Sequence, residues 1–305
     1  MNIVRAAWKR LPVVVRALLS GSAMAAAGTL PWAFLVGLNL KHGSAFPWAV
    51  PPTALYLWLY WRYARGNGWP RSTADARRSS CRANRVADDV WGMALLAGIL
   101  GLAGLLLLQR VQSRLVTLPQ QQDIDPSQYP LLTVVAWVTM SALVAGVTEE
   151  TSFRGYMQGP IERRHGPAIA ILLTGTLFGF AHATHAEFDL TLMPFYLGVA
   201  TVYGTLAYLT NSIYPGMLLH AGGNVLVAIG LFAAGASEWQ AAPEGQPLIW
   251  ETGADAGFWL TVAIALIVTG AAVWAYALLA RVAGDAPLET TSAGTLERRA
   301  PDGCD

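Results

Sequence analysis

The sequence predicts an all-α protein, a polytopic membrane helix bundle of about eight transmembrane helices. Of its 305 residues, 54% are hydrophobic and 13% are charged, about half of the ~25% charged share typical of a soluble domain. The apolar residues form long uncharged runs that can cross the ~30 Å hydrocarbon layer, which takes roughly 20 helical residues. The basic residues gather between alternate runs. These three observations indicate that most of the chain is surrounded by lipid.

Three uncharged runs in the first part of the chain can span a membrane, namely Ala17–Leu40, Gly43–Trp61 and Val90–Leu108. Two shorter runs, Leu131–Thr148 and Pro167–Ala181, each lead into ionisable residues. Such an interruption is expected where a polar site lies inside a span, because charged groups in hydrocarbon are costly and usually functional.

The remaining apolar sequence divides into three helices. The run Leu190–Ser237 contains one ionisable residue, His220, and is too long for a single helix. We expect a turn in its middle, where glycine, proline and small polar residues occur, namely Asn211, Ser212, Pro215 and Gly216. The run Ala256–Ala280 is the last span and brings the predicted count to eight.

The basic residues predict which side each loop faces, because short cytoplasmic loops collect Lys and Arg whereas Asp and Glu contribute little. With the amino terminus inside, 17 of the 20 basic residues lie on the cytoplasmic side, seven of them from Arg62 to Arg85. The outer segments hold only Lys41, Arg110 and Arg114. We therefore expect both termini to be cytoplasmic.

The two ends of the chain allow other interpretations. Arg5, Lys9 and Arg10 before an apolar run are typical of a signal peptide. However, the run Ala17–Leu40 is longer than the apolar region of roughly 7–15 residues in a signal, so we expect an uncleaved helix. The polar tail after Ala280 lacks periodicity and is expected to be disordered.

Charge and cysteine content argue against several classes of protein. The balance of 20 basic against 19 acidic residues gives no overall field that would attract nucleic acid. The two cysteines, Cys81 and Cys304, have no CxxC or CxxH partner that would indicate a zinc site. We expect no nucleic-acid partner and no disulfide framework.

The strongest candidate for chemistry is the pair Glu149 and Glu150, followed by Arg154. On an α-helix Glu150 and Arg154 can pair, whereas Glu149 points about 100° away and is left without that partner. A carboxylate without a partner in low dielectric has a raised proton affinity, which suits a general base acting on water. The alternative is that the helix has already reached the cytosol at Glu149.

His182 is the second candidate. It follows Gly175 and Gly179, whose spacing forms a face where another helix can approach closely. A hydrogen-bonded packing histidine is the alternative. His185 lies before Glu187 in a predicted outer loop, and we treat it as non-catalytic.

The third candidate is the pair His220 and Asn224, whose four-residue spacing places both side chains on one helix face. Gly222 and Gly223 between them would let a neighbouring helix or a peptide approach. Two such donors could hold the oxyanion of a tetrahedral intermediate. The alternative is a hydrogen bond that joins two helices of the bundle.

The depth of the motifs suggests a shared site. Glu149 lies about 16 residues before, and His182 about 16 after, a basic turn at Arg163–Gly166. At ~1.5 Å per residue, both would lie about 24 Å along their helices. His220 is only five residues past Pro215, so either the preceding helix extends into the cytosol or the turn sits deep.

Together these residues resemble a known family. Glu149-Glu150 with Arg154, Phe178 with His182, and His220 with Asn224 are similar to the EExxxR, FxxxH and HxxxN motifs of the CPBP membrane peptidases, the CAAX protease and bacteriocin-processing family. The resemblance covers roughly residues 131–234. It divides the chain into 1–130, with three helices and the basic loop; 131–234, a catalytic core of four helices; and 235–305, with an outer loop, the last helix and the tail.

The resemblance implies an intramembrane endopeptidase that cleaves a peptide or membrane-attached protein near the cytoplasmic face of a bacterial inner membrane. Glu149 would activate water with help from His182, and His220 and Asn224 would form the oxyanion site. Glu150 and Arg154 would support them. The favoured interpretation requires no cofactor, although Glu149, His182 and His220 could supply three zinc ligands.

Two other functions remain open from the sequence. The same polar cluster could bind a peptide or partner helix in a non-catalytic scaffold or a bacteriocin self-immunity protein, which the resemblance also covers. A transporter would use the two glutamates as a proton relay. Against transport, the sequence lacks an inverted repeat of broken helices.

Overall fold

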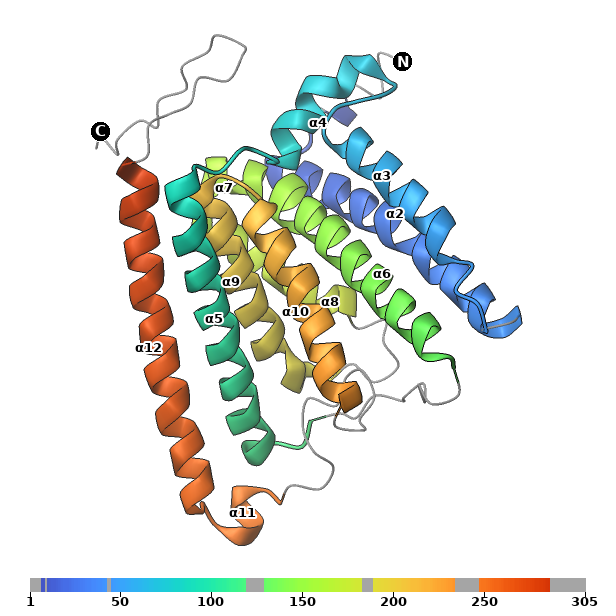
Figure 1. The fold of residues 1–305 in the computed structure, drawn as a ribbon. Helices are drawn as coiled ribbons and strands as arrows, with labels where there is room; N and C mark the ends of the chain where they lie inside the picture. Colours follow the sequence, from blue (N-terminus) through green and yellow to red (C-terminus); the bar gives the residue numbers. More distant parts are fainter. Residues whose placement is uncertain are drawn as a thin grey trace, which may run out of the picture.

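The computed structural model describes residues 7–8, 10–42, 45–118, 129–182, 189–233 and 247–285. Within these ranges the regular secondary structure is helical, and the long helices pack side by side in one bundle (Figure 1). The predicted class, a helical membrane bundle, is confirmed. The expected disordered tail lies mostly outside the described residues.

The first two long helices form a hairpin. Helix α2 (Val13–His42) and α3 (Val50–Ala64) are joined through Asn39, whose amide accepts from the Ala49 N–H and donates to the Phe46 carbonyl, both at 3.0 Å. The expected start of the second span at Gly43 is wrong. Helix α3 begins at Val50 because two prolines follow directly, and proline fits the first turn of a helix.

A short amphipathic segment follows α3 and covers one end of the bundle. It consists of a 3₁₀ turn, η1 (Arg71–Thr73), and helix α4 (Ala74–Cys81). Figure 1 shows α4 at the same end as α7 and the end of α12. A Cβ at Gly155 would lie 2.8 Å from the Cys81 carbonyl oxygen, so α4 packs directly on the helix that carries the glutamates.

Two long helices form one side of the bundle. Helix α5 (Asp88–Leu115) packs along α12 (Ala256–Asp285), and α11 (Ile249–Thr252) precedes α12 at the other end (Figure 1). A Cβ at Gly104 would lie 2.9 Å from the Thr269 hydroxyl, which accounts for the close approach of these helices.

The centre of the bundle is a continuous helix that changes type along its length. Helix α6 (Leu131–Glu149) runs into a π-helix, η3 (Glu150–Gln158), and then into α7 (Gly159–His165). Gly166, with φ of 82°, ends α7 and allows the turn into α8 (Pro167–Ala181). The turn predicted at Arg163–Gly166 is therefore confirmed.

Two further helices complete the core. After the 3₁₀ turn η5 (Leu190–Leu192), α9 (Met193–Thr210) packs against α8, and α10 (Tyr214–Ala233) packs along α6. The turn between α9 and α10 falls where the sequence predicted it. Asn211 adopts a left-handed conformation with φ of 47° and ends α9.

The outer surface of the bundle is apolar, as expected of a protein in lipid. Large hydrophobic side chains such as Phe34, Leu226 and Ile267 are more than 60% exposed. In the described part of the chain, five helical segments are long and apolar enough to cross a membrane, and α8 is a shorter apolar helix. The protein is an integral membrane protein, while the count of eight complete spans stays a prediction.

Candidate active site

Both glutamates lie inside the bundle. Every residue of η3 is buried, and Glu150 has no exposed surface. The helix is therefore covered by other parts of the protein after Glu149, and whether this part lies within the membrane stays a prediction. The π-helical bonding of η3 was not expected from the sequence, and π-helices are frequent at functional sites because they change the direction of side chains within a helix.

Glu150 and Arg154 form the expected pair. Arg154 Nη1 lies 3.3 Å from Glu150 Oε1, and both side chains are almost completely buried. The Arg154 guanidinium also lies over two aromatic rings, 4.9 Å from the centre of Phe178 and 5.3 Å from that of Tyr203. Such cation–π contacts stabilise a charge that has lost its water.

His220 contacts both glutamates across the bundle. Its Nδ1 lies 2.9 Å from Glu150 Oε1, and its Nε2 lies 3.7 Å from Glu149 Oε2. A carboxylate only accepts, so Nδ1–H donates to Glu150. As its helix position predicted, Glu149 forms no ion pair with Arg154 among the described residues. Instead, α10 packs along α6 and brings His220 opposite both carboxylates.

Gly216 makes this arrangement possible. A Cβ at this position would lie 2.7 Å from Glu150 Oε2 and 3.3 Å from the carboxyl carbon. Nearby, a Cβ at Gly146 on α6 would lie 2.9 Å from that of Ala221 on α10. Two glycines, one on each helix, therefore allow the approach that brings His220 to the glutamates.

Glu149 differs from Glu150 in its surroundings. Its side chain is 20% exposed, whereas that of Glu150 has no exposed surface. The Glu149 Oε2 atom, however, is buried and has no hydrogen-bond partner among the described residues. A buried carboxylate oxygen without a donor is costly and calls for a bound molecule or a function.

His182 is connected to the same cluster through aromatic rings. Its Nδ1 lies 2.8 Å from the Phe178 carbonyl oxygen, and a carbonyl only accepts, so Nδ1 carries a hydrogen. Its ring stacks on Tyr196, with ring centres 4.6 Å apart, and lies 4.5 Å from Phe178. Phe178 in turn lies under Arg154, which places His182 one ring away from the Glu150–Arg154 pair.

The glycine face before His182 has the predicted role. A Cβ at Gly175 would lie 2.7 Å from that of Ala200, and one at Gly179 would lie 2.6 Å from the Met193 sulfur. Both contacts are with α9, so the close helix approach expected at this face is confirmed.

Asn224 lies one turn after His220 on α10 and is half-buried. The glycines between them do not contact another of the described helices, because among the described residues a Cβ at Gly222 or Gly223 would meet nothing within 4 Å. The expectation that a neighbouring helix approaches there is wrong, since the close contacts of α10 come earlier, at Gly216 and Ala221. A peptide at Gly222 stays a prediction.

Two tyrosines on α9 belong to the site and were missed from the sequence. The Tyr203 ring stacks on His220 with ring centres 5.0 Å apart and planes inclined by 11°, and Tyr196 stacks on His182. The two tyrosines are seven residues apart, which places them on one helix face. That spacing is the signal that could have found them.

The turn between α9 and α10 sets where α10 begins, and so places His220 opposite the glutamates. Ser212 and Ile213 in this turn have no exposed surface. Ser212 Oγ donates to the Asn84 carbonyl and the Ile213 N–H to the Arg82 carbonyl. The turn thus lies beneath the segment after α4, while its depth in the membrane stays a prediction.

Zinc is the group that the family resemblance leaves open. Zinc sites in proteins use three or four nitrogen, oxygen or sulfur ligands. Among the residues that the structure describes, no three His, Cys, Asp or Glu side chains are placed to hold a metal ion. Glu149, His182 and His220 in this arrangement do not fit such a site. His185 lies outside the described residues.

Comparison with known proteins gives one match. Residues 131–226 match the family model described as type II CAAX prenyl endopeptidase Rce1-like. This segment contains all six candidate site residues and covers less than a third of the chain. The comparisons with curated proteins and with solved structures found no match. The family resemblance is thereby confirmed: residues 131–226 of this integral membrane protein are similar to the Rce1-like type II CAAX prenyl endopeptidases, which supports an intramembrane protease activity.

Proposed function

We propose that this chain is an intramembrane endopeptidase that hydrolyses a peptide bond near the cytoplasmic membrane face with a water activated by Glu149. The observation that carries the proposal is the buried Glu149 Oε2, which has no hydrogen-bond partner among the described residues and lies 3.7 Å from His220 Nε2. A polar contact of this length leaves room for a bridging molecule.

In the proposed reaction, the Glu149 carboxylate takes a proton from water, and the water oxygen attacks the carbonyl carbon of the substrate. The tetrahedral intermediate then collapses as the C–N bond breaks. The proton held by Glu149 passes to the leaving amine. His182 assists by orienting the water, because its bond to the Phe178 carbonyl keeps the hydrogen on Nδ1 and leaves Nε2 as the acceptor.

His220 and Asn224 bind the oxyanion in this proposal. Glu150 already accepts from His220 Nδ1–H. For Nε2 to donate to the oxyanion as well, the imidazole must carry a hydrogen on each nitrogen while it lies beside the two carboxylates. Glu150 and Arg154 hold that ring in place, and the Asn224 amide supplies the second donor.

The substrate class is a peptide or membrane-attached protein, and the membrane is a bacterial inner membrane with both termini of the chain on the cytoplasmic side. Two features support this orientation: α4 and α7, with Arg78, Arg163 and Arg164, lie at one end of the bundle, and the start of α5 and the end of α12 lie there too (Figure 1). Reporter fusions at Ser237 and at the carboxyl terminus test it, and an externally active carboxyl-terminal fusion would contradict it.

The test of the reaction compares purified wild-type protein with Glu149→Gln in detergent, on a fluorescence-quenched peptide that carries a prenylated cysteine. Glutamine keeps the size of the side chain but cannot act as a base. We expect the rate per folded molecule to fall by at least about 100-fold, with an unchanged thermal unfolding midpoint.

A fully active Glu149→Gln protein would contradict the general-base role. If a chelator abolishes hydrolysis and zinc restores it, Glu149 becomes a ligand rather than the base. If wild type binds the peptide without cleaving it, the non-catalytic scaffold replaces the peptidase.

A further inference from the structure

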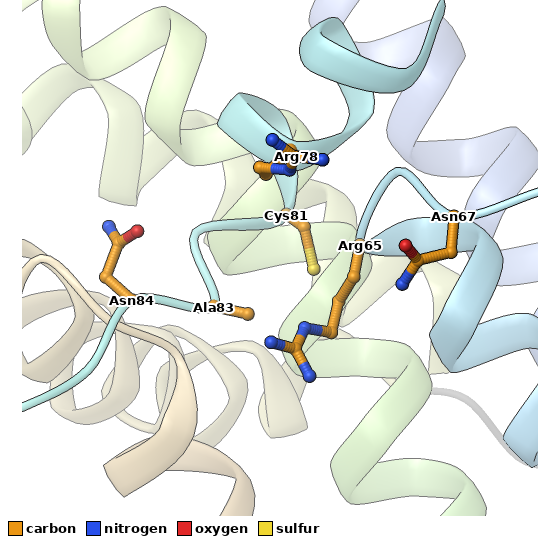
Figure 2. Close-up of a pocket in the computed structure, with 6 residues that line it drawn as sticks. All are labelled: Arg65, Asn67, Arg78, Cys81, Ala83 and Asn84. Carbon is orange, nitrogen blue, oxygen red and sulfur yellow. The ribbon is translucent and has the colours of Figure 1, made fainter. Parts of the chain in front are cut away.

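A polar cavity lies at the end of the bundle covered by α4. It has a volume of about 310 Å³ and lies between the chain leaving α3, the helix α4 and the segment after it. Figure 2 shows the side chains that line it: Arg65, Asn67, Arg78, Cys81, Ala83 and Asn84. None of these residues belongs to the candidate active site.

The lining carries positive charge and no acidic residue. Arg65 comes from the end of α3 and Arg78 from α4, so arginines from two different elements line one cavity. Burial raises the pKa of the Cys81 thiol to about 12, so the thiol in the wall is neutral at physiological pH. The acid nearest to Arg78 is Asp75 at 3.9 Å, and this exposed pair contributes little.

Two other arginines of this segment, Arg77 and Arg82, have structural partners. Arg77 is buried and donates to the carbonyls of Tyr63 at 2.9 Å and Pro70 at 3.1 Å. Arg82 forms a double contact with the Glu162 carboxylate at 2.9 and 3.0 Å. Arg65 and Arg78 differ from them because they line the cavity, and the contacts described for them are weak: the Trp61 ring at 5.6 Å from Arg65 and the exposed Asp75 carboxylate at 3.9 Å from Arg78.

The backbone around the cavity is held in a fixed geometry before any ligand binds. Gly66 has φ of 85°, and a Cβ there would collide with the Ala74 carbonyl oxygen, so the chain after α3 lies against α4. Arg77 binds the same loop through its carbonyl groups. A site that is already formed loses less entropy on binding an anion.

Aromatic residues place this cavity at the membrane surface. Trp58 and Trp69 are exposed, and the Arg62 guanidinium lies 4.7 Å over the Trp58 ring. Tryptophan and arginine together are typical of the headgroup level on the cytoplasmic side, where anionic lipids gather.

We propose that the cavity between α3 and α4 is a binding site for a phosphate group, held by the guanidinium groups of Arg65 and Arg78 and the Asn67 amide. Arginine forks match the oxygen geometry of phosphate. The group comes either from an anionic phospholipid headgroup or from free phosphate. Its binding holds α4 on the end of α3, and through Gly155 on η3. The proposal does not depend on the peptidase activity.

The test measures thermal unfolding of the full-length protein in neutral detergent with two probes, inorganic phosphate at constant ionic strength and mixed micelles of phosphatidylglycerol against phosphatidylcholine. The cavity variant is Arg65→Gln/Arg78→Gln. The matched control is Arg71→Gln/Arg85→Gln, which removes the same charge from exposed positions of the same segment outside the cavity.

We expect a saturable rise of the unfolding midpoint in wild type and control, with the half-saturating concentration about 10-fold or more higher in the cavity variant, because hydrogen bonds to charged groups are lost. A response to inorganic phosphate identifies a small anion, and a response to phosphatidylglycerol alone identifies a lipid headgroup. Equal responses in cavity variant and control, or no response in wild type, overturn the proposal. If the cavity variant does not fold, the double variant Arg65→Lys/Arg78→Lys is tested in its place, because lysine keeps the charge but lacks the guanidinium fork. The same outcomes then support or overturn the proposal.

Discussion

His220 Nδ1 lies 2.9 Å from Glu150 Oε1, although the two residues are 70 positions apart. The same carboxylate oxygen lies 3.3 Å from Arg154 Nη1. Glu150 therefore joins a histidine on α10 to an arginine one turn along its own helix. It is the residue that fixes the geometry around Glu149, which has the more accessible carboxylate.

The first prediction concerns this junction. Glu150→Gln removes the charge between Arg154 and His220, so we expect both a lower folded yield and a lower rate per folded molecule. Loss of one partner of a buried pair typically costs about 3–5 kcal/mol. Adding Arg154→Gln should recover part of the loss, with a coupling energy of about 1 kcal/mol or more in a double-mutant cycle of unfolding free energies. Additive effects would show that the two side chains do not interact.

The second prediction concerns Gly216, where an added Cβ would lie 2.7 Å from Glu150 Oε2. Gly216→Ala should displace this carboxylate from His220 and lower the hydrolytic rate by about 10- to 100-fold, because small misplacements in an active site are costly. Gly230→Ala on the same helix is the control, since among the described residues its Cβ would meet nothing within 4 Å. A normal rate in Gly216→Ala would show that Glu150 can move without consequence.

The third prediction concerns the stacked tyrosine at His220. Tyr203→Phe keeps the ring, which lies 5.0 Å from that of His220, and should retain most of the activity. Tyr203→Leu removes the ring from both His220 and Arg154, and this should lower kcat and shift the pH–rate profile. A purely structural role would lower the folded yield and leave the profile of the folded fraction unchanged.

The sequence indicated candidate residues but few of the contacts between them. Glu149, His182 and His220 were singled out because ionisable residues in apolar runs are candidates for function. The structure places Glu149 at the end of α6, His182 at the end of α8 and His220 within α10. The pairing of Glu150 with Arg154 followed from their spacing. The contact of His220 with both glutamates did not, because it depends on the rotation of α10 against α6, which is set by Gly146 and Gly216 on different helices.

Two other features lie beyond what one sequence indicates. The π-helix at Glu150–Gln158 has no local signal, since its residues are compatible with an α-helix. Helix α4 was counted as part of a basic loop, because the arginines between Arg62 and Arg85 indicate only the side of the membrane. Two of these, Arg77 and Arg82, are instead buried and bind carbonyl and carboxylate groups.

The last prediction concerns pH and the end of the bundle opposite α4. Asp255 Oδ1 accepts from the Phe258 N–H at 2.7 Å at the start of α12, and Oδ2 lies 3.1 Å from Arg114 Nη2. The hydrogen bond from the Phe258 N–H, and to a smaller extent that from Arg114, lowers the pKa of Asp255 below its ordinary value. The group thus stabilises the fold above its unfolded pKa of about 3.9, and this contribution is lost as pH falls through the lower folded value.

Asp255→Asn separates the charge from the cap, because asparagine also caps a helix well, whereas Asp255→Ala removes both. At neutral pH the thermal unfolding midpoint should therefore fall in the order wild type, Asn and Ala variant. On acidification below about pH 4, the wild-type midpoint should converge on that of Asp255→Asn, since protonated aspartate no longer attracts Arg114. Taking the difference between the two proteins cancels the titration of the other carboxylates. If this difference is the same at neutral pH and at a pH below the pKa of Asp255 in the folded protein, the charge of Asp255 does not stabilise the junction of α5 and α12.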